Sequence, residues 1–197
     1  MKRRGFLGAI VATAMALAAG LAKGVRRKDG SWLLRPPGAL PEFDFLSACQ
    51  RCYRCASACP NDCIRFYGLQ DGLELALTPY IRAREKACTL CGECAKACPT
   101  GAIVPFEATP EGWIENVDMG SARLNTSLCF SYNGRTCGAC YQACPLPGHA
   151  MKIGVFETPI LQGSDACVGC GLCEQACLHL PQAIRVVPRR IEELGAA

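Results

Sequence analysis

Cysteine is the residue type best able to do chemistry in this chain of 197 residues, which contains 17 of them. That number is far above the usual level for a globular protein, so the thiols either bind metal or form cross-links. An odd number argues against a simple disulfide framework. The spacing is stronger evidence against such a framework, because all but one of the cysteines fall into four runs of four.

The four runs share one pattern, with short gaps of two residues and then three residues before the fourth cysteine. The first two runs follow it fully and are Cys49, Cys52, Cys55 and Cys59–Pro60, then Cys88, Cys91, Cys94 and Cys98–Pro99. The third run widens its first gap to seven residues, and the fourth has Leu178 where proline is expected; they are Cys129, Cys137, Cys140 and Cys144–Pro145, then Cys167, Cys170, Cys173 and Cys177.

This spacing is that of bacterial ferredoxins, in which three thiolates bind one [4Fe–4S] cluster and the fourth reaches the other cluster of a pair. We expect the fourth cysteine at the start of a short helix, and the tight loops to turn backbone N–H groups towards the negatively charged cluster. Zinc is the alternative, but zinc sites take two cysteine pairs from separate loops. The sequence therefore predicts four [4Fe–4S] clusters with iron bound through these cysteines. It offers no nucleophile–base pair or nucleotide loop, so no catalytic residue is expected.

A small residue that opens a β-strand follows each run, and its position indicates how the runs pair. It lies four positions after the fourth cysteine in the first two runs (Cys63, Ala102) and six positions after it in the last two (Ala150, Ala183). Neighbouring runs therefore pair, although nested pairing of the first with the fourth run and the second with the third stays open. Neighbour pairing gives four ligand sets: Cys49, Cys52, Cys55 and Cys98 (cluster 1); Cys88, Cys91, Cys94 and Cys59 (cluster 2); Cys129, Cys137, Cys140 and Cys177 (cluster 3); Cys167, Cys170, Cys173 and Cys144 (cluster 4).

The remaining cysteine, Cys63, occupies the position that Ala102 has after the second run. We interpret it as a small buried residue under a cluster, because a free cysteine packs like a small hydrophobe. A substitute ligand or a redox-active thiol is the alternative.

These runs predict an α+β fold of two tandem dicluster ferredoxin modules, with short helices and small β-hairpins around the clusters. The modules are expected over residues 45–104 and 124–188, joined by a cysteine-free connection over 105–123 and followed by a tail over 189–197. A proline-rich lead-in over 29–44 is expected to be extended, since proline forbids helix there, and either packs along the first module or docks a partner. Within the first module, Gln70–Asp71–Gly72 predicts the turn of a hairpin between residues 64–69 and 73–78.

The first 28 residues predict an export signal. Arg3 and Arg4 precede an apolar run over residues 5–22, as in a twin-arginine signal, which exports proteins that are already folded and loaded. The segment is either cleaved or kept as a membrane anchor. It carries seven basic residues and no acidic one, so the rest of the chain has a net charge of −3. Bound clusters make that body more acidic, which disfavours a nucleic-acid partner.

Two further features lie close to the last runs. His149 and His179 each follow a fourth cysteine and are expected either at the surface or close enough to a cluster to tune its potential. The insert over 130–136 separates Cys129 from the rest of its run and is expected to be a loop excursion.

The combined order of these features resembles the NapG/MauM family of periplasmic ferredoxin-type proteins. The resemblance rests on the paired arginines, the Leu34–Leu40 segment, four cysteine runs, a stretched third run and a fourth without proline. It implies four [4Fe–4S] clusters and a membrane partner of the NapH/MauN type that oxidises quinol. The acceptor is then a periplasmic redox enzyme such as nitrate reductase, or the setting is methylamine utilisation.

Four functions stay open on the sequence. The favoured one is an electron relay between the membrane partner and a periplasmic acceptor. The others are a maturation factor for methylamine dehydrogenase, an electron-transfer subunit of another oxidoreductase complex, and a zinc-binding interaction module.

Overall fold

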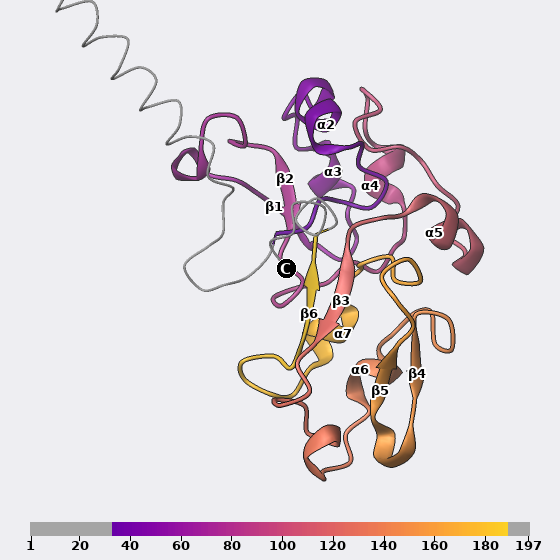
Figure 1. Cartoon of the computed structure of the whole chain (residues 1–197). Helices are drawn as coiled ribbons and strands as arrows, with labels where there is room; N and C mark the ends of the chain where they lie inside the picture. The colour runs from indigo at the N-terminus through magenta and orange to yellow at the C-terminus, as the bar shows by residue number, and fades with distance from the viewer. Residues whose placement is uncertain (1–32, 189–197) are drawn as a thin grey trace, which may run out of the picture.

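A computed structural model of the chain describes residues 33–188. The predicted export signal, the start of the lead-in and the tail lie outside these residues. Short elements dominate the fold (Figure 1). The helices are α2 (Glu42–Ala48), α3 (Arg54–Ser57), α4 (Glu93–Lys96), α5 (Pro110–Asn116), α6 (Ala139–Gln142) and α7 (Leu172–Ala176), with 3-10 turns η1 (Leu69–Asp71), η2 (Ser131–Asn133) and η3 (Val155–Glu157). The strands are β1 (Ile64–Phe66), β2 (Pro79–Ile81), β3 (Ser121–Leu124), β4 (Met151–Ile153), β5 (Pro159–Leu161) and β6 (Ile184–Val187).

The strands pair in the same way in both halves of the chain. Between the first two cysteine runs β1 pairs antiparallel with β2, and between the last two runs β4 pairs antiparallel with β5. The segment before the third run, β3, pairs with the segment after the fourth run, β6. In the first half the equivalent contact is the single bridge between Ala39 and Ile103. In each half, the strand pairs thus enclose two neighbouring cysteine runs. The predicted tandem ferredoxin fold is confirmed.

The hairpin of the first module differs from the predicted one. Asp71 accepts a hydrogen bond from the backbone N–H of Gly68 at 2.8 Å, which closes the 3-10 turn η1 rather than a two-residue hairpin turn. The chain then continues through further turns before β2 begins at Pro79. Residues 73–78 are therefore part of the loop, and Leu73, which the alternating pattern placed in a strand, is exposed.

The cysteine-free connection over 105–123 is partly ordered. Thr109 accepts a hydrogen bond from the Gly112 N–H and begins α5, whose first position is a proline, as is common in helices. The indole of Trp113 donates to the Leu90 carbonyl at 3.1 Å and so fixes α5 against the second cysteine run. Strand β3 begins at Ser121, so the sheet of the second module starts inside the predicted connection.

The proline-rich lead-in packs along the first module, which was the first of its two expected outcomes. Leu34 exchanges backbone hydrogen bonds with Ile81 and is fully buried, and Pro36 and Pro37 are buried beside it. The lead-in therefore adds a single bridging residue, Leu34, to the edge of the β1–β2 pair, and its last residues are not extended but begin α2 at Glu42.

One hydrophobic core runs through both modules. It includes Leu34 and Ile81 of the first module together with Met151, Ile184 and Val186 of the second. Cysteines of all four runs are among its members or pack against it. Within residues 33–188, no helix is long and apolar enough to cross a membrane.

Candidate iron–sulfur sites

The third cysteine of every run lies on a short helix. These cysteines are Cys55 on α3, Cys94 on α4, Cys140 on α6 and Cys173 on α7, and all four are buried. The sequence predicted the fourth cysteine at the start of a short helix, and this prediction was wrong. The fourth cysteine instead follows the helix that carries the third. The reason is local, because the proline after the fourth cysteine in three runs disfavours helical backbone at the residue before it.

The loops around the second cysteine have unusual backbone angles. The residue after it caps the helix with a left-handed conformation in every run, as Tyr53, Gly92, Gly138 and Gly171. In the second run Leu90 is also left-handed, and its N–H points at the Cys88 sulfur at 3.3 Å. A left-handed backbone conformation costs free energy in residues other than glycine. Its recurrence at the same position in every run therefore indicates a loop conformation that is functionally required. An N–H directed at sulfur stabilises a thiolate, as the spacing predicted.

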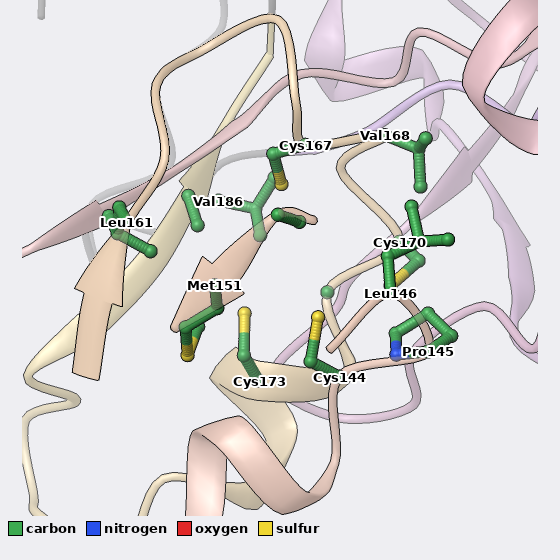
Figure 2. Close-up of a pocket in the computed structure, with 13 residues that line it drawn as sticks. Cys144, Pro145, Leu146, Met151, Leu161, Cys167, Val168, Cys170, Cys173 and Val186 are labelled. Atoms are coloured by element: carbon green, nitrogen blue, oxygen red, sulfur yellow. The ribbon is translucent and has the colours of Figure 1, made fainter. Parts of the chain in front are cut away.

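Three of the four predicted cysteine sets each line one pocket. We call the sets the first to fourth sites, in the order of the predicted clusters. The pockets of the first, third and fourth sites contain ≈ 350, ≈ 350 and ≈ 380 Å³ of empty space, including space open to solvent. The cysteines that line them are Cys49, Cys52, Cys55 and Cys98; Cys129, Cys137, Cys140 and Cys177; and Cys144, Cys167, Cys170 and Cys173. In each pocket the fourth thiol comes from the neighbouring run, and Figure 2 shows the sulfurs of Cys144, Cys167 and Cys173 directed into one space.

The thiols predicted for the second site line none of these three pockets, but electrostatic interactions connect them. Burial, then the neighbouring Cys91, Cys55 and Cys59, raise the pKa of Cys94 to about 12. Cys59 of the first run thus lies close to the second run. Cys63 links them further, since its sulfur is 3.6 Å from that of Cys59 and its thiol interacts with that of Cys88.

Burial raises the pKa of most of the buried thiols, so that they lose their proton only when they bind metal. Burial is the main cause that raises the pKa of Cys55 and Cys140 to about 11 and that of Cys170 to about 12. At neutral pH such groups are protonated, and ligation requires the thiolate. Cys98 is different. Burial alone would raise its pKa, but the Ile103 N–H and the Thr100 hydroxyl stabilise the thiolate, so its pKa is lowered.

The residues present fit iron–sulfur clusters. The first, third and fourth sites each offer four thiols around a space of similar size. Within the described residues, no group of three or more His, Cys, Asp or Glu side chains is placed to hold a single metal ion. A bound [4Fe–4S] cluster would supply one-electron chemistry, at a potential set by hydrogen bonds to sulfur and by solvent exposure.

The insert in the third run folds back on itself. Asn133 donates hydrogen bonds to three carbonyls, including that of Cys129 at 2.7 Å, and the Tyr132 hydroxyl donates to Pro159. These bonds return Cys129 to the pocket that Cys137 lines, although seven residues separate the two in sequence. The sequence showed the excursion but gave no sign that Asn133 closes it.

The two histidines have different surroundings. His179 lines the pocket of the third site, where its ring contacts Phe130 at a centroid distance of 5.2 Å and its Nδ1 is 2.7 Å from the Pro181 carbonyl oxygen. His149 is exposed and accompanies none of the three pockets. Of the two outcomes expected, His149 takes the surface one, and His179 is the histidine near a predicted cluster site.

Cys63 is buried to the same degree as its counterparts Ala102, Ala150 and Ala183, which confirms the small buried position after each run. Its contacts with Cys59 and Cys88 go further than that interpretation. Only the fold shows the contact with Cys88, because Cys63 and Cys88 lie on either side of the β1–β2 hairpin.

Glu174 is a buried carboxylate that joins α7 to β6, and its replacement gives a stability prediction. Its Oε2 accepts the Val186 N–H at 2.7 Å, and burial raises the pKa of the carboxyl. Glu174→Ala leaves that buried N–H without an acceptor, at a cost of about 1–3 kcal/mol. Glu174→Gln keeps a carbonyl acceptor and removes the buried charge. Cluster loss in urea, followed anaerobically by visible absorbance, should be fastest in the Ala variant.

The pH dependence of stability separates the effect of the buried Glu174 charge from that of its hydrogen bond to Val186. A carboxyl whose folded pKa is raised stabilises the fold below its unfolded pKa of about 4.3, and this contribution is lost as pH rises through the folded pKa. The advantage of Glu174→Gln over the native protein should therefore be larger at about pH 8 than at about pH 5. An equal effect at both pH values would contradict the buried-charge argument.

Comparisons with known proteins agree with the cysteine sites. A 4Fe-4S dicluster domain model matches residues 48–102 and 87–147, and a 4Fe-4S binding domain model matches residues 164–178. The first two matches overlap on the second cysteine run, so they locate iron–sulfur domains without choosing the pairing. The residues are therefore those of a [4Fe–4S] protein.

The similar curated proteins include two named groups of ferredoxin-type proteins. The methylamine utilization ferredoxin-type protein MauM of Methylorubrum extorquens is 38% identical over 80% of this chain and 74% of its own length. MauM of Paracoccus denitrificans is 40% identical over 79% of this chain and 71% of its own length. The ferredoxin-type protein NapG of Escherichia coli is 38% identical over 98% of this chain and 89% of its own length.

Proposed function

Because the chain belongs to the NapG/MauM family of ferredoxin-type proteins, we propose that it holds four [4Fe–4S] clusters and relays electrons from a membrane quinol-oxidising partner to a periplasmic redox enzyme. It is an electron carrier and not an enzyme. The observation that carries the proposal is the convergence of four thiols, drawn from two neighbouring runs, on each of three similar pockets.

The ligands follow from this convergence. The first, third and fourth sites use the cysteines that line their pockets, and the second uses Cys88, Cys91, Cys94 and Cys59. The chain itself supplies the thiolates, the burial and the hydrogen bonds that set each potential. His179 beside the third site and Cys63 beside the second are placed to adjust those hydrogen bonds.

The partners and the compartment follow from the family and the leader. A partner of the NapH/MauN type would deliver electrons, and a periplasmic acceptor such as nitrate reductase would receive them. The twin-arginine pair Arg3–Arg4 supports export of the loaded protein, after which residues 5–22 are cleaved or remain as an anchor. The acidic body suits docking to basic surfaces.

The proposal predicts a metal content and a dependence on the membrane partner. Anaerobic analysis should find about sixteen iron and about sixteen sulfide per chain. Quinol should reduce the clusters rapidly only when the membrane partner is present. Stoichiometric zinc with little iron would overturn the cofactor assignment, and clusters that stay oxidised in the complete complex would overturn the direction of the relay.

A second function has equal support from the comparisons, because MauM and NapG relatives match at the same identity of 38%. In the methylamine setting the protein would be an accessory ferredoxin for methylamine dehydrogenase. Gene neighbourhood separates the two, since a nitrate reductase cluster favours the relay and a methylamine dehydrogenase cluster favours the accessory role.

A further inference from the structure

We infer that the chain places its four sites in a single series in the order first, second, fourth, third, so that the fourth site and not the third follows the second. This inference rests on the four clusters of the proposed function. It concerns the positions of the sites, which the order of the cysteine runs along the chain does not give.

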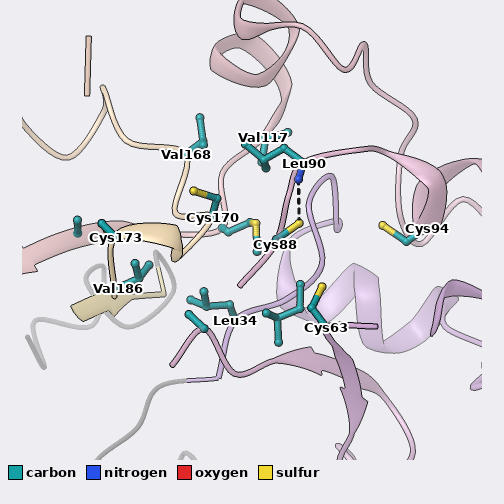
Figure 3. Packing of buried hydrophobic residues seen from close by; sticks show 14 of the residues in the cluster. Leu34, Cys63, Cys88, Leu90, Cys94, Val117, Val168, Cys170, Cys173 and Val186 are labelled. Carbon is teal, nitrogen blue, oxygen red and sulfur yellow. Dashed lines mark hydrogen bonds between the residues drawn. The ribbon is translucent and has the colours of Figure 1, made fainter. Parts of the chain in front are cut away.

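The strongest evidence is the junction between the modules. The backbone N–H of Cys88, a ligand of the second site, donates to the carbonyl of Cys170, a ligand of the fourth, at 3.1 Å. Figure 3 shows these two cysteines next to each other, with Cys94 and Cys63 on the far side of Cys88 and Cys173 on the far side of Cys170. A direct hydrogen bond between the ligand loops makes these two sites neighbours.

Further bonds hold the same two segments together. The Ala87 N–H donates to the Gln175 side chain at 3.0 Å, and the Arg84 guanidinium donates to the Cys177 carbonyl at 3.2 Å. Gly171 lies against Ala83 so closely that a Cβ at Gly171 would collide with the Ala83 side chain. The junction is therefore built by residues 83–88 of the first module and residues 170–177 of the second.

Helix packing gives the order inside each module. Cys55 of the first site lies on α3 and Cys94 of the second on α4, and these helices pack together. In the same way Cys140 of the third site lies on α6 and Cys173 of the fourth on α7, which also pack together. The thiols of each pair are close enough to interact electrostatically.

Exposure agrees with this order. The pocket of the fourth site has no exposed residue among those that line it, whereas that of the first site includes exposed Cys52 and Tyr53. The pocket of the third site includes Leu178, which is 69% exposed. The first and third sites, which end the series, thus have exposed lining residues, whereas the fourth does not.

Magnetic coupling between reduced clusters tests the order in solution, because it is strong only between neighbours. The double variant Cys52→Ala/Cys137→Ala removes one ligand from each outer site and leaves the second and fourth sites, which belong to different modules. Its matched control, Cys91→Ala/Cys167→Ala, leaves the first and third sites. The electron paramagnetic resonance spectrum should be split or broadened by coupling in the first variant and should consist of uncoupled signals in the control.

Coupling in the control without coupling in the first variant would overturn the order. The iron content of the native protein reports separately on the proposed function, because too little iron contradicts the four clusters whatever the order. The positions of iron in the native protein, from anomalous scattering of a crystal, give a second measurement that needs no variant. The shortest distance between modules should join the second and fourth sites, and a shorter distance for any other pair would contradict the series.

A milder variant tests the junction itself. Arg84→Met, combined with the outer-site double variant, removes the bonds to the Cys177 and Glu174 carbonyls and touches no ligand side chain. The coupling should weaken at unchanged iron content. Lys152→Met in the same background is the control, since Lys152 is exposed on β4 and lies outside residues 83–88 and 170–177. Equal coupling in both variants would show that Arg84 does not hold the junction.

Discussion

Replacing Cys98 by Ala should remove the cluster of the first site and leave the cluster held by the rest of its own run. Cys98 lies in the second run, yet it lines the pocket with Cys49, Cys52 and Cys55. Burial acts against its thiolate there, but hydrogen bonds from the Ile103 N–H and the Thr100 hydroxyl outweigh it and lower the pKa of Cys98. We expect the iron content to fall by about four of about sixteen atoms per chain.

Two double variants identify which cluster is lost. If Cys98 and Cys52 serve the same cluster, Cys52→Ala/Cys98→Ala loses no more iron than either single variant, about four atoms. Cys91→Ala/Cys98→Ala then affects two clusters and loses about eight. The reverse result would mean that Cys98 binds the cluster of its own run. Nested pairing predicts a different outcome, in which Cys137→Ala/Cys98→Ala loses only about four.

The second large effect is expected at Arg35, which ties the lead-in to the first module. Its guanidinium donates two hydrogen bonds to the Glu42 carboxylate, at 2.6 and 3.0 Å, and two more to the Thr78 hydroxyl and the Pro79 carbonyl. It also lies over the rings of Phe45 and Tyr67. Only 10% of the Arg35 side chain is exposed, so Arg35 and Glu42 form a largely buried ion pair. The guanidinium has further hydrogen-bond acceptors in Thr78 and Pro79.

Arg35→Met should make anaerobic cluster loss in urea about 30-fold faster, which corresponds to about 2 kcal/mol. Breaking a largely buried pair is costly because the Glu42 carboxylate keeps its charge and loses the two hydrogen bonds from Arg35. Kinetics are the proper measure, since cluster loss is irreversible. Arg35→Met/Glu42→Gln should recover part of the loss. Arg65→Met is the control, because its pair with Asp62 is exposed and contributes about 0–1 kcal/mol.

An Arg35→Met variant as slow to lose its clusters as the control would contradict this role. The region at risk is the first site, because Phe45, which Arg35 covers, lines its pocket. Absorbance should therefore fall in two phases in this variant, with the clusters of the second module persisting longer.

Much of the fold and most of the candidate site could be predicted from the sequence, for a simple physical reason. A cluster ligand set is local, with three thiols inside seven residues, so the spacing of Cys88, Cys91 and Cys94 is itself the geometry. The matched intervals to Cys63 and Ala102 likewise reflect buried positions that recur after each run. Short-range patterns of this kind can be recognised in the sequence without knowledge of the tertiary structure.

Local turns were harder to predict, because competing hydrogen bonds decide them. Asp71 could close a hairpin turn or cap the 3-10 turn η1, and its bond to Gly68 gives the second outcome. The same holds for Asn133, whose three bonds to carbonyls return Cys129 to its pocket.

The cysteine runs by themselves determined that this chain is an iron–sulfur protein with tandem ferredoxin domains. Only the tertiary structure decided how the modules meet. The bond from Cys88 to Cys170 joins residues 82 positions apart, and no periodicity or spacing encodes such a contact. It arises because both ligand loops must bury their apolar sides in one shared core, and that requirement turns two ferredoxin modules into one series of sites.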